Sequence, residues 1–164
     1  MPSGKPRGFT FLEVLVVMIN ISIILAIAVP AFISWVPKYQ LKAAVRDLQS
    51  SFQLCKWKAI KENADCVIQF DLDRYTVGGE TFHLPVNAGI GFGAPTGDGI
   101  PDGAQPRDGI TFPQNKATFK CTGRPHQMGA VYLKNDKGHG FALSVNILGH
   151  VRAWKWEKGA WQKQ

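Results

Sequence analysis

The sequence predicts an α+β fold in which one long N-terminal helix packs on a β-rich C-terminal domain. An almost unbroken apolar run follows Phe9, and an apolar stripe with helical spacing follows Lys38, so a helix is expected through both. Beyond Asn63 the chain alternates short strand-like segments with turns rich in glycine, proline and aspartate. The predicted regions are a leader at 1–8, a membrane-spanning helix at 9–29, an amphipathic helix at 30–63 and a β-rich domain at 64–164.

A glutamate interrupts the apolar run near its start. The run opens with Phe9-Thr10-Phe11-Leu12-Glu13 and continues to Val29. About 20 residues give a helix of roughly 30 Å, the thickness of one bilayer core. An ionised carboxylate inside such a helix costs roughly 2.5–3.5 kcal/mol on insertion scales. Glu13 is therefore expected to have a partner or a function, which a plain single-span anchor does not explain.

The residues before the run form a short, polar and basic leader. Met1–Gly8 contains Lys5 and Arg7, and it ends in a glycine directly before the apolar run. A secretory signal peptide instead places its small residues and its cleavage site after the apolar region. The position of Gly8 therefore distinguishes this segment from an ordinary secretory signal.

This N-terminal string resembles the type IV prepilin signature, a basic leader and glycine followed by Phe-Thr-x-x-Glu and a hydrophobic helix. The resemblance implies that a prepilin peptidase cuts between Gly8 and Phe9 and that the new Phe9 amine is N-methylated. It also implies a pilin-like fold, in which Glu13 pairs with the Phe9 amine of a neighbouring subunit. Pro30 matches the family's proline, while Ser22 stands where many pilins carry glycine.

The resemblance also implies a place for the protein in the cell. The chain would be a single-pass protein of the bacterial inner membrane. Its leader would be cytoplasmic, and its C-terminal domain would lie in the periplasm or in an extracytoplasmic filament. Its partners would be other pilin or pseudopilin subunits and the prepilin peptidase.

An amphipathic helix is predicted between Lys38 and Asn63. Pro30 and Pro37 lie between the membrane span and this helix, and each removes a backbone donor and can kink a helix. Phe9 to Asn63 is therefore expected to be one long, bent helix. Its apolar stripe, at alternating steps of four and three residues, comprises Leu41, Val45, Leu48, Phe52, Cys55 and Ala59.

The remainder of the chain predicts strands separated by turns. Asp71-Leu72-Asp73 and Asn135-Asp136-Lys137-Gly138 are turn sequences, and residues 85–109 are predicted to be a long loop. The expected strands are 66–70, 74–77, 81–84, 110–112, 117–121, 130–133, 141–145 and 150–156.

A narrower resemblance covers nearly the whole chain. The helix segment Cys55–Asn63 is similar to the helix end of minor pilins and pseudopilins of the GspH/FimT type. Ile110–Phe112, Thr122–Pro125 and Gly149–Arg152 are similar to later parts of that family, the last two to its Pro-Arg-Gly turn and its Gly-Arg-x-Arg close. His150 and the Thr-Gly-Arg of the turn depart from the usual letters. The implied function is a minor pilin or pseudopilin of a type II secretion system or a type IV pilus.

The positive charge of the chain is concentrated near its C-terminus. The net charge is +7, and residues 116–164 hold nine lysines and arginines against two acidic residues. Some members of the resembled family bind DNA during natural transformation, which makes DNA an alternative partner here. The residues concerned are His150, Arg152, Lys155 and Lys158, beside tryptophans that could stack on bases. Strand alternation offers the other interpretation, in which Val151, Ala153 and tryptophans face the core and the lysines face solvent.

The three cysteines suggest one disulfide. Cys55 falls on the apolar stripe and is expected to be a reduced, buried residue. Cys66 and Cys121 both lie at the ends of predicted strands. They are the expected pair in an oxidising compartment.

No residue pattern predicts an enzyme, a cofactor or a metal site. The sequence contains no Cys-x-x-Cys spacing, no phosphate-binding loop and no Gly-x-Ser-x-Gly element. Asp98 and Asp102, followed by Asp108, supply oxygens but lack the ligand spacing of an EF-hand, so a plain turn is favoured over a calcium site.

Overall fold

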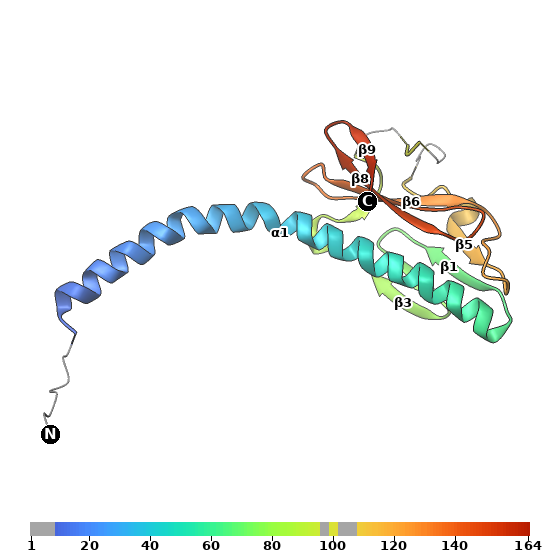
Figure 1. Cartoon of the computed structure of the whole chain (residues 1–164), viewed down its shortest axis with the longest axis horizontal. Helices are drawn as coiled ribbons and strands as arrows, with labels where there is room; N and C mark the ends of the chain where they lie inside the picture. The colour runs from blue at the N-terminus through green and yellow to red at the C-terminus, as the bar shows by residue number, and fades with distance from the viewer. Residues whose placement is uncertain (1–8, 96–98, 102–107) are drawn as a thin grey trace, which may run out of the picture. The chain divides into compact units, whose positions relative to one another are not determined.

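The computed structural model describes residues 9–95, 99–101 and 108–164. Helix α1 (Phe11–Glu62) begins the fold and is followed by nine strands within the described residues (Figure 1). The chain divides into two compact units, Met1–Val36 and Pro37–Gln164, and the boundary lies inside α1 at Pro37. The expected long helix and β-rich domain are confirmed as a general α+β layout.

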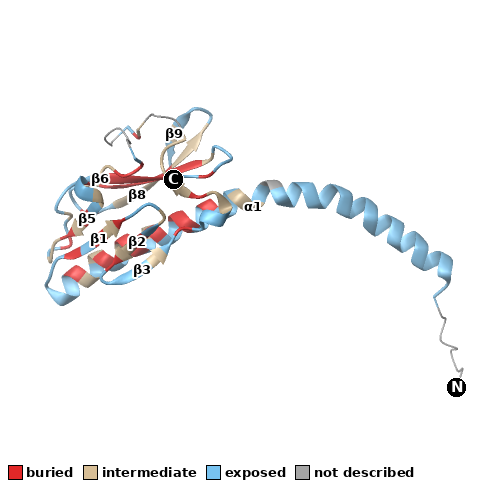
Figure 2. Ribbon diagram, turned by 180° about the vertical axis from the view of Figure 1, so that it is seen from behind, coloured by how far each residue is buried: buried red, intermediate tan, exposed pale blue. Residues whose placement is uncertain are grey.

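The first unit is an exposed apolar helix. Every residue from Phe9 to Ile33 is exposed, as the uniform pale blue of this part of α1 in Figure 2 shows. An 18-residue window in α1 has a mean hydropathy of 2.7, and none of it is buried. Among the described residues, α1 is the one helix long and apolar enough to span a membrane. An apolar surface of this extent needs lipid or another protein around it.

In the second unit the predicted stripe of α1 is buried. Its exposed fractions range from 0 to 4%, and α1 ends where the stripe ends. Asn63 adopts a left-handed φ of 50°, and the Ala64 amide donates to the Ala59 carbonyl at 3.3 Å. This arrangement is a Schellman-type stop, which satisfies a carbonyl that the helix end would leave free. The buried stripe residues are Leu41, Val45, Leu48, Phe52, Cys55 and Ala59.

Two antiparallel sheets pack with this part of α1. The first has the order β3-β2-β1-β5, and the second has the order β4-β6-β7-β8-β9. The strands of the first sheet are β1 (Cys66–Phe70), β2 (Arg74–Val77), β3 (Glu80–His83) and β5 (Lys116–Phe119). Those of the second are β4 (Gly91–Phe92), β6 (Gly129–Lys134), β7 (Gly140–Val145), β8 (Val151–Glu157) and β9 (Ala160–Lys163).

Phe52 lies at the centre of the main core. Its ring centroid is 6.1 to 6.2 Å from those of Phe70, Phe112 and Phe119. Alternate residues of β6 and β7, including Leu133 and Leu143, join the same core from the second sheet. Burial of these aromatic and aliphatic side chains is therefore what joins α1 to both sheets.

The opposite face of the second sheet has its own smaller core. Tyr132, Ala142 and Trp154 are buried there, together with Ile100. The Tyr132 hydroxyl accepts a hydrogen bond from the Ile100 amide at 3.0 Å, and the Trp154 indole N–H donates to Ser144 Oγ at 2.9 Å. Both faces of β6 and β7 are consequently buried, unlike the one-sided burial expected of a solvent-facing sheet.

Most of the predicted strands are present, with three differences. Residues 110–112 are not a strand, since only Ile110 forms an isolated bridge, with Val131. Strand β4 lies inside the region predicted to be a loop, and β9 was not predicted. Both are short edge strands, and β9 pairs with β8 across a turn at Lys158-Gly159. Each is a strand because it pairs with a neighbouring strand, and its own residues do not indicate that pairing.

The expected Cys66–Cys121 disulfide is wrong. Cys55 instead bonds to Cys66, with Cα atoms 5.5 Å apart, and Cys121 is a partly buried free thiol. The apolar stripe carries Cys55 onto the sheet, where it meets the first residue of β1. Cys66 pairs in register with Phe119, which places Cys121 two residues further along. The disulfide therefore ties the last turns of α1 to β1.

We predict that this disulfide stabilises the second unit. Peptide mapping without reduction should find Cys55 joined to Cys66 in exported protein. Cys55→Ser or Cys66→Ser should lower the free energy of unfolding by about 3 kcal/mol, because the bond closes a short loop in the unfolded chain. Thermal unfolding followed by tryptophan fluorescence would measure the change. Cys121→Ser is the matched control and should have little effect; a Cys66–Cys121 peptide in the native protein would contradict the prediction.

Candidate functional site

Thr10 caps the N-terminus of α1. Its Oγ1 accepts a hydrogen bond from the Glu13 amide at 3.2 Å, and its carbonyl accepts one from the Val14 amide at 3.3 Å. Threonine followed three residues later by glutamate is the spacing of a capping box. The sequence predicted a role for Glu13 but missed this cap, although the Thr-x-x-Glu spacing indicates it.

The Glu13 carboxylate lies in the first turn of an exposed apolar helix. A negative charge there interacts favourably with the helix dipole, typically by 0.3–1 kcal/mol. That gain is smaller than the cost of placing a carboxylate within a membrane. Within the described residues the structure gives this carboxylate no ionic partner. Phe9 is described and exposed, whereas Gly8 lies outside the described residues.

The polar residue Ser22 is accommodated within the apolar part of α1. Its hydroxyl donates to the Met18 carbonyl at 2.8 Å, one turn back along α1. This bond satisfies the hydroxyl inside an apolar segment. Pro30 lies within the same helix, which continues past it. Serine at this position is therefore compatible with an intact helix.

The two C-terminal motifs recognised in the sequence meet in space. Gly123, from the turn after β5, and Gly149, from the turn before β8, are in close contact. A Cβ on Gly149 would lie 2.5 Å from the Gly123 carbonyl oxygen, and both glycines have a φ of 74°. Lys56 of α1 donates to the Gly149 carbonyl at 3.2 Å. The left-handed backbone favours glycine at both positions, and at Gly149 a side chain would also clash with the backbone of the other turn.

The turn that contains Gly149 is fixed by Asn146. The Asn146 side-chain oxygen accepts hydrogen bonds from the Leu148 amide at 3.0 Å and from the His150 amide at 2.9 Å. A third bond joins the Gly149 amide to the Asn146 carbonyl at 2.8 Å. An asparagine that bonds its own following backbone stabilises a tight turn. The turn is thus rigid, although Ile147 and Leu148 at its tip are 65% and 56% exposed.

The structure does not bring the four candidate DNA-binding residues onto one face. Arg152 and Trp154 alternate with Ala153 and Lys155 along β8, so Arg152 and Lys155 point to opposite faces. His150 lies before the strand, and Lys158 lies in the β8–β9 turn with a φ of 53°. A shared cationic track along β8 is therefore not formed.

The alternation in β8 differs in part from the expectation. Val151 and Ala153 pack on the main core, as predicted, but Trp154 is buried on the other face of the sheet. Lys155 donates to Glu157 at 2.5 Å, and this hydrogen bond, with the lysine's charge, lowers the pKa of Glu157. Trp154 and Lys155 are therefore already engaged within the domain.

The acidic loop is only partly described. Asp98 and Asp102 lie outside the described residues. Asp108 accepts a hydrogen bond from the Ile110 amide at 3.2 Å, which is the behaviour of an aspartate in a turn.

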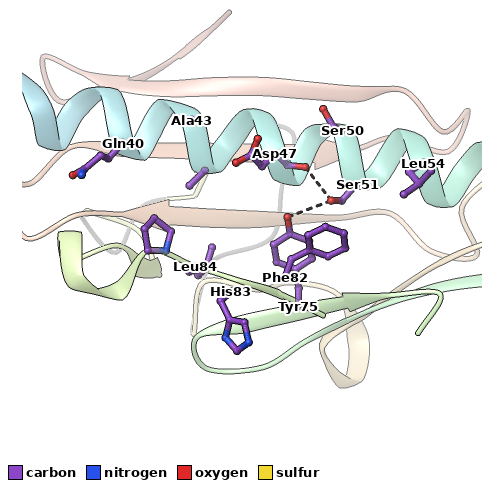
Figure 3. Close-up of a pocket in the computed structure, with 12 residues that line it drawn as sticks. Gln40, Ala43, Asp47, Ser50, Ser51, Leu54, Tyr75, Phe82, His83 and Leu84 are labelled. Atoms are coloured by element: carbon purple, nitrogen blue, oxygen red, sulfur yellow. Dashed lines mark hydrogen bonds between the residues drawn. The ribbon is translucent and has the colours of Figure 1, made fainter. Parts of the chain in front are cut away.

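A groove that the sequence did not reveal runs between α1 and the edge strand β3. It holds about 820 Å³. Small residues on α1 leave the space, and Tyr75 and Phe82 form its floor, with ring centroids 5.3 Å apart (Figure 3). The residues lining this α1–β3 groove are Gln40, Ala43, Ala44, Asp47, Ser50, Ser51, Leu54, Tyr75, Phe82, His83, Leu84 and Pro85.

Polar groups line the groove on both sides: Asp47, Ser50 and Ser51 come from α1, and His83 comes from β3. Ser51 Oγ lies 3.2 Å from the Tyr75 hydroxyl and 3.0 Å from the Asp47 carbonyl oxygen (Figure 3). Burial raises the pKa of Tyr75, and the Asp47 carboxylate raises it further, against the Ser51 hydrogen bond. Among the described residues that line the groove, Asp47 is the one with a carboxylate. The groove is consequently apolar with one negative side.

Comparisons with protein-family models, with curated proteins and with solved structures find no match to this chain.

We predict that DNA binding by this chain is weak. At low salt the full chain in neutral detergent should shift duplex DNA only at high protein concentration, and the shift should vanish by about 200 mM salt, because few phosphates are neutralised. A gel-shift titration would measure this. Persistent binding at that salt, abolished by Arg152→Ala but not by the control Lys137→Ala in a distant turn, would support a DNA receptor instead.

Proposed function

We propose that this chain is a pilin-like subunit, a minor pilin or pseudopilin of a type II secretion system or a type IV pilus. The observation that carries the proposal is Glu13, an acidic residue in the first turn of a helix whose next turns are exposed and, apart from Asn20 and Ser22, apolar. The chain acts by assembly rather than by catalysis. A prepilin peptidase removes residues 1–8, and α1 enters the core of a filament.

Charge pairing explains why the carboxylate is retained. Cleavage after Gly8 would create a free amine at Phe9, one turn before Glu13 in sequence. Within an apolar helix bundle, the Glu13 carboxylate of one subunit and the Phe9 amine of its neighbour would neutralise each other. A subunit packed out of register would leave both charges unpaired, which is strongly unfavourable in an apolar setting. The pair therefore selects one axial stagger between neighbouring helices.

The capping box offers a simpler role for Glu13, and the two roles can be separated. Capping needs a hydrogen-bonding side chain three residues after Thr10, which glutamine also supplies. Charge pairing needs the negative charge itself. The substitution Glu13→Gln therefore keeps the capping geometry and removes only the charge.

The proposed function predicts how the chain is processed. In cells that contain a prepilin peptidase, the mature chain should begin at Phe9 and carry one N-methyl group, because the leader ends at Gly8. Intact-mass and N-terminal peptide mass spectrometry would show this. A chain that keeps residues 1–8, or one cut after Ala26 or Ala28, would contradict the proposal.

The proposed function also predicts how substitutions at Glu13 affect assembly. Glu13→Gln and Glu13→Ala should both be cleaved, yet both should be recovered with partner pilins at a level about tenfold or more below the native chain, because an unpaired amine would remain among apolar helices. Co-purification from sheared filaments or cross-linked membranes would measure recovery.

Thr10→Ala is the matched control, since it removes the cap and keeps the charge. It should be cleaved and incorporated better than Glu13→Gln. If Glu13→Gln assembles normally while Thr10→Ala does not, Glu13 acts as a cap and the proposed charge pair is wrong.

A further inference from the structure

Two aliphatic side chains project from the turn between β7 and β8. We call Ile147 and Leu148 the apolar knob. Tight turns usually carry polar residues, yet here two adjacent aliphatic residues are more than half exposed. The hydrogen bonds of Asn146 hold the turn. Lys56 donates to its Gly149 carbonyl, and the backbone of Gly123 packs against Gly149. The knob is therefore held in one conformation before any partner binds, which lowers the entropy cost of binding.

Basic and apolar groups surround the knob. Met128 directly precedes β6. Because Gly129 pairs with Val145, Met128 lies opposite Asn146, and it is 62% exposed. Ile60 of α1 contacts Gly123 and is 41% exposed. Arg124 is exposed in the turn that contacts Gly149. The knob therefore presents an aliphatic tip, and the exposed Arg124 belongs to the turn that contacts the knob's own turn.

The α1–β3 groove has the complementary properties. It is concave and lined mainly by apolar surface, and its volume is about 820 Å³. Its charged lining residue is Asp47, whose exposed carboxylate acts on the hydroxyl of Tyr75 in the floor. An aliphatic knob with a neighbouring guanidinium matches an aromatic floor with a neighbouring carboxylate.

We propose that the apolar knob of one copy of this chain docks in the α1–β3 groove of a second copy. Ile147 and Leu148 pack on Tyr75 and Phe82, and Arg124 pairs with Asp47. The inference goes beyond the proposed function and does not rest on processing or on Glu13, because every residue in it belongs to the second unit.

A membrane surface or a nucleic acid fits the knob less well. Surface attraction to anionic lipid is worth about 1 kcal/mol per basic residue, and Lys56 beside the knob is already hydrogen-bonded to the Gly149 carbonyl. Bases stack on aromatic faces, whereas the knob is aliphatic. A protein surface that offers a hydrophobic hollow and a carboxylate satisfies both features, and this chain carries such a surface.

The two surfaces differ, so the contact is head-to-tail. A contact between unlike surfaces leaves a free knob at one end and a free groove at the other, and it therefore extends into open assemblies. A single knob buries little area, so we expect the contact to be weak unless copies are concentrated by a shared membrane or filament.

Site-directed cross-linking of the full chain in its membrane tests the docking. Two differently tagged copies are expressed together, and both carry Cys121→Ser. One copy also carries His150→Cys beside the knob, and the other carries Ser50→Cys in the groove. A short bismaleimide should join them into a mixed-tag dimer. Leu72→Cys replaces His150→Cys in the control, because Leu72 is an exposed aliphatic residue in another turn. That control pair should yield about tenfold less dimer.

Second-site changes decide whether the contact is the one proposed. Leu148→Ser in the His150→Cys copy, or Arg124→Glu there, should lower the mixed-tag dimer about fivefold. Asp47→Arg in the Ser50→Cys copy should restore the dimer with Arg124→Glu and lower it with the native arginine. An intact Cys55–Cys66 disulfide in each variant shows that the domain has folded.

Several outcomes would overturn the inference. One is a mixed-tag dimer no stronger than the Leu72→Cys control; another is a dimer that Leu148→Ser leaves unchanged. Failure of the Asp47→Arg and Arg124→Glu combination to recover the dimer would exclude the pairing of these residues. Cross-linking of His150→Cys only to other proteins would assign the knob to a different partner. Since none of these results alters cleavage or the effect of Glu13→Gln, they are distinguishable from failure of the proposed function.

Discussion

The removal of apolar surface from water constrains this chain most strongly, and α1 meets that constraint in two ways. From Leu41 onward the helix buries one stripe against its own sheets, and a stripe of six residues leaves a polar face for solvent. From Phe9 to Ile33 every residue is exposed and, apart from Thr10, Glu13, Asn20 and Ser22, apolar. The first unit is thus complete only within a bilayer or among other helices. The second unit has a core of its own.

The second unit depends on close backbone contacts as well as on its aromatic core. Phe52 fixes α1 against both sheets, and the disulfide from Cys55 fixes the end of the helix to β1. At the same end, Gly123 and Gly149 allow two turns to touch below Lys56. These constraints share one region, and they explain why a turn with two exposed aliphatic residues is rigid rather than frayed.

Sequence periodicity correctly predicted the helices and strands whose residue spacing is visible within the segment itself. The stripe from Leu41 to Ala59 and the strands of the β6–β7 hairpin follow from spacing alone. Features that depend on two distant segments were not predictable in this way. The partner of Cys66 is set by the packing of α1 on the sheet, β4 and β9 exist because of their neighbours, and the α1–β3 groove arises where small helix residues face Tyr75.

A similar distinction applies to Glu13. Its capping role affects the stability of the helix end, whereas the proposed charge pair would affect the free energy of assembly. Locally, the Glu13 amide is bonded by the Thr10 hydroxyl and the carboxylate interacts with the helix dipole, effects that any aqueous helix would share. Such gains of about 1 kcal/mol do not offset the cost of a carboxylate at membrane depth, which is two to three times larger. An aqueous helix would have no reason to follow this cap with some twenty exposed apolar residues. The cap therefore explains how α1 begins, while in the proposed filament an amine at the same depth on a neighbouring helix would remove the cost for both groups.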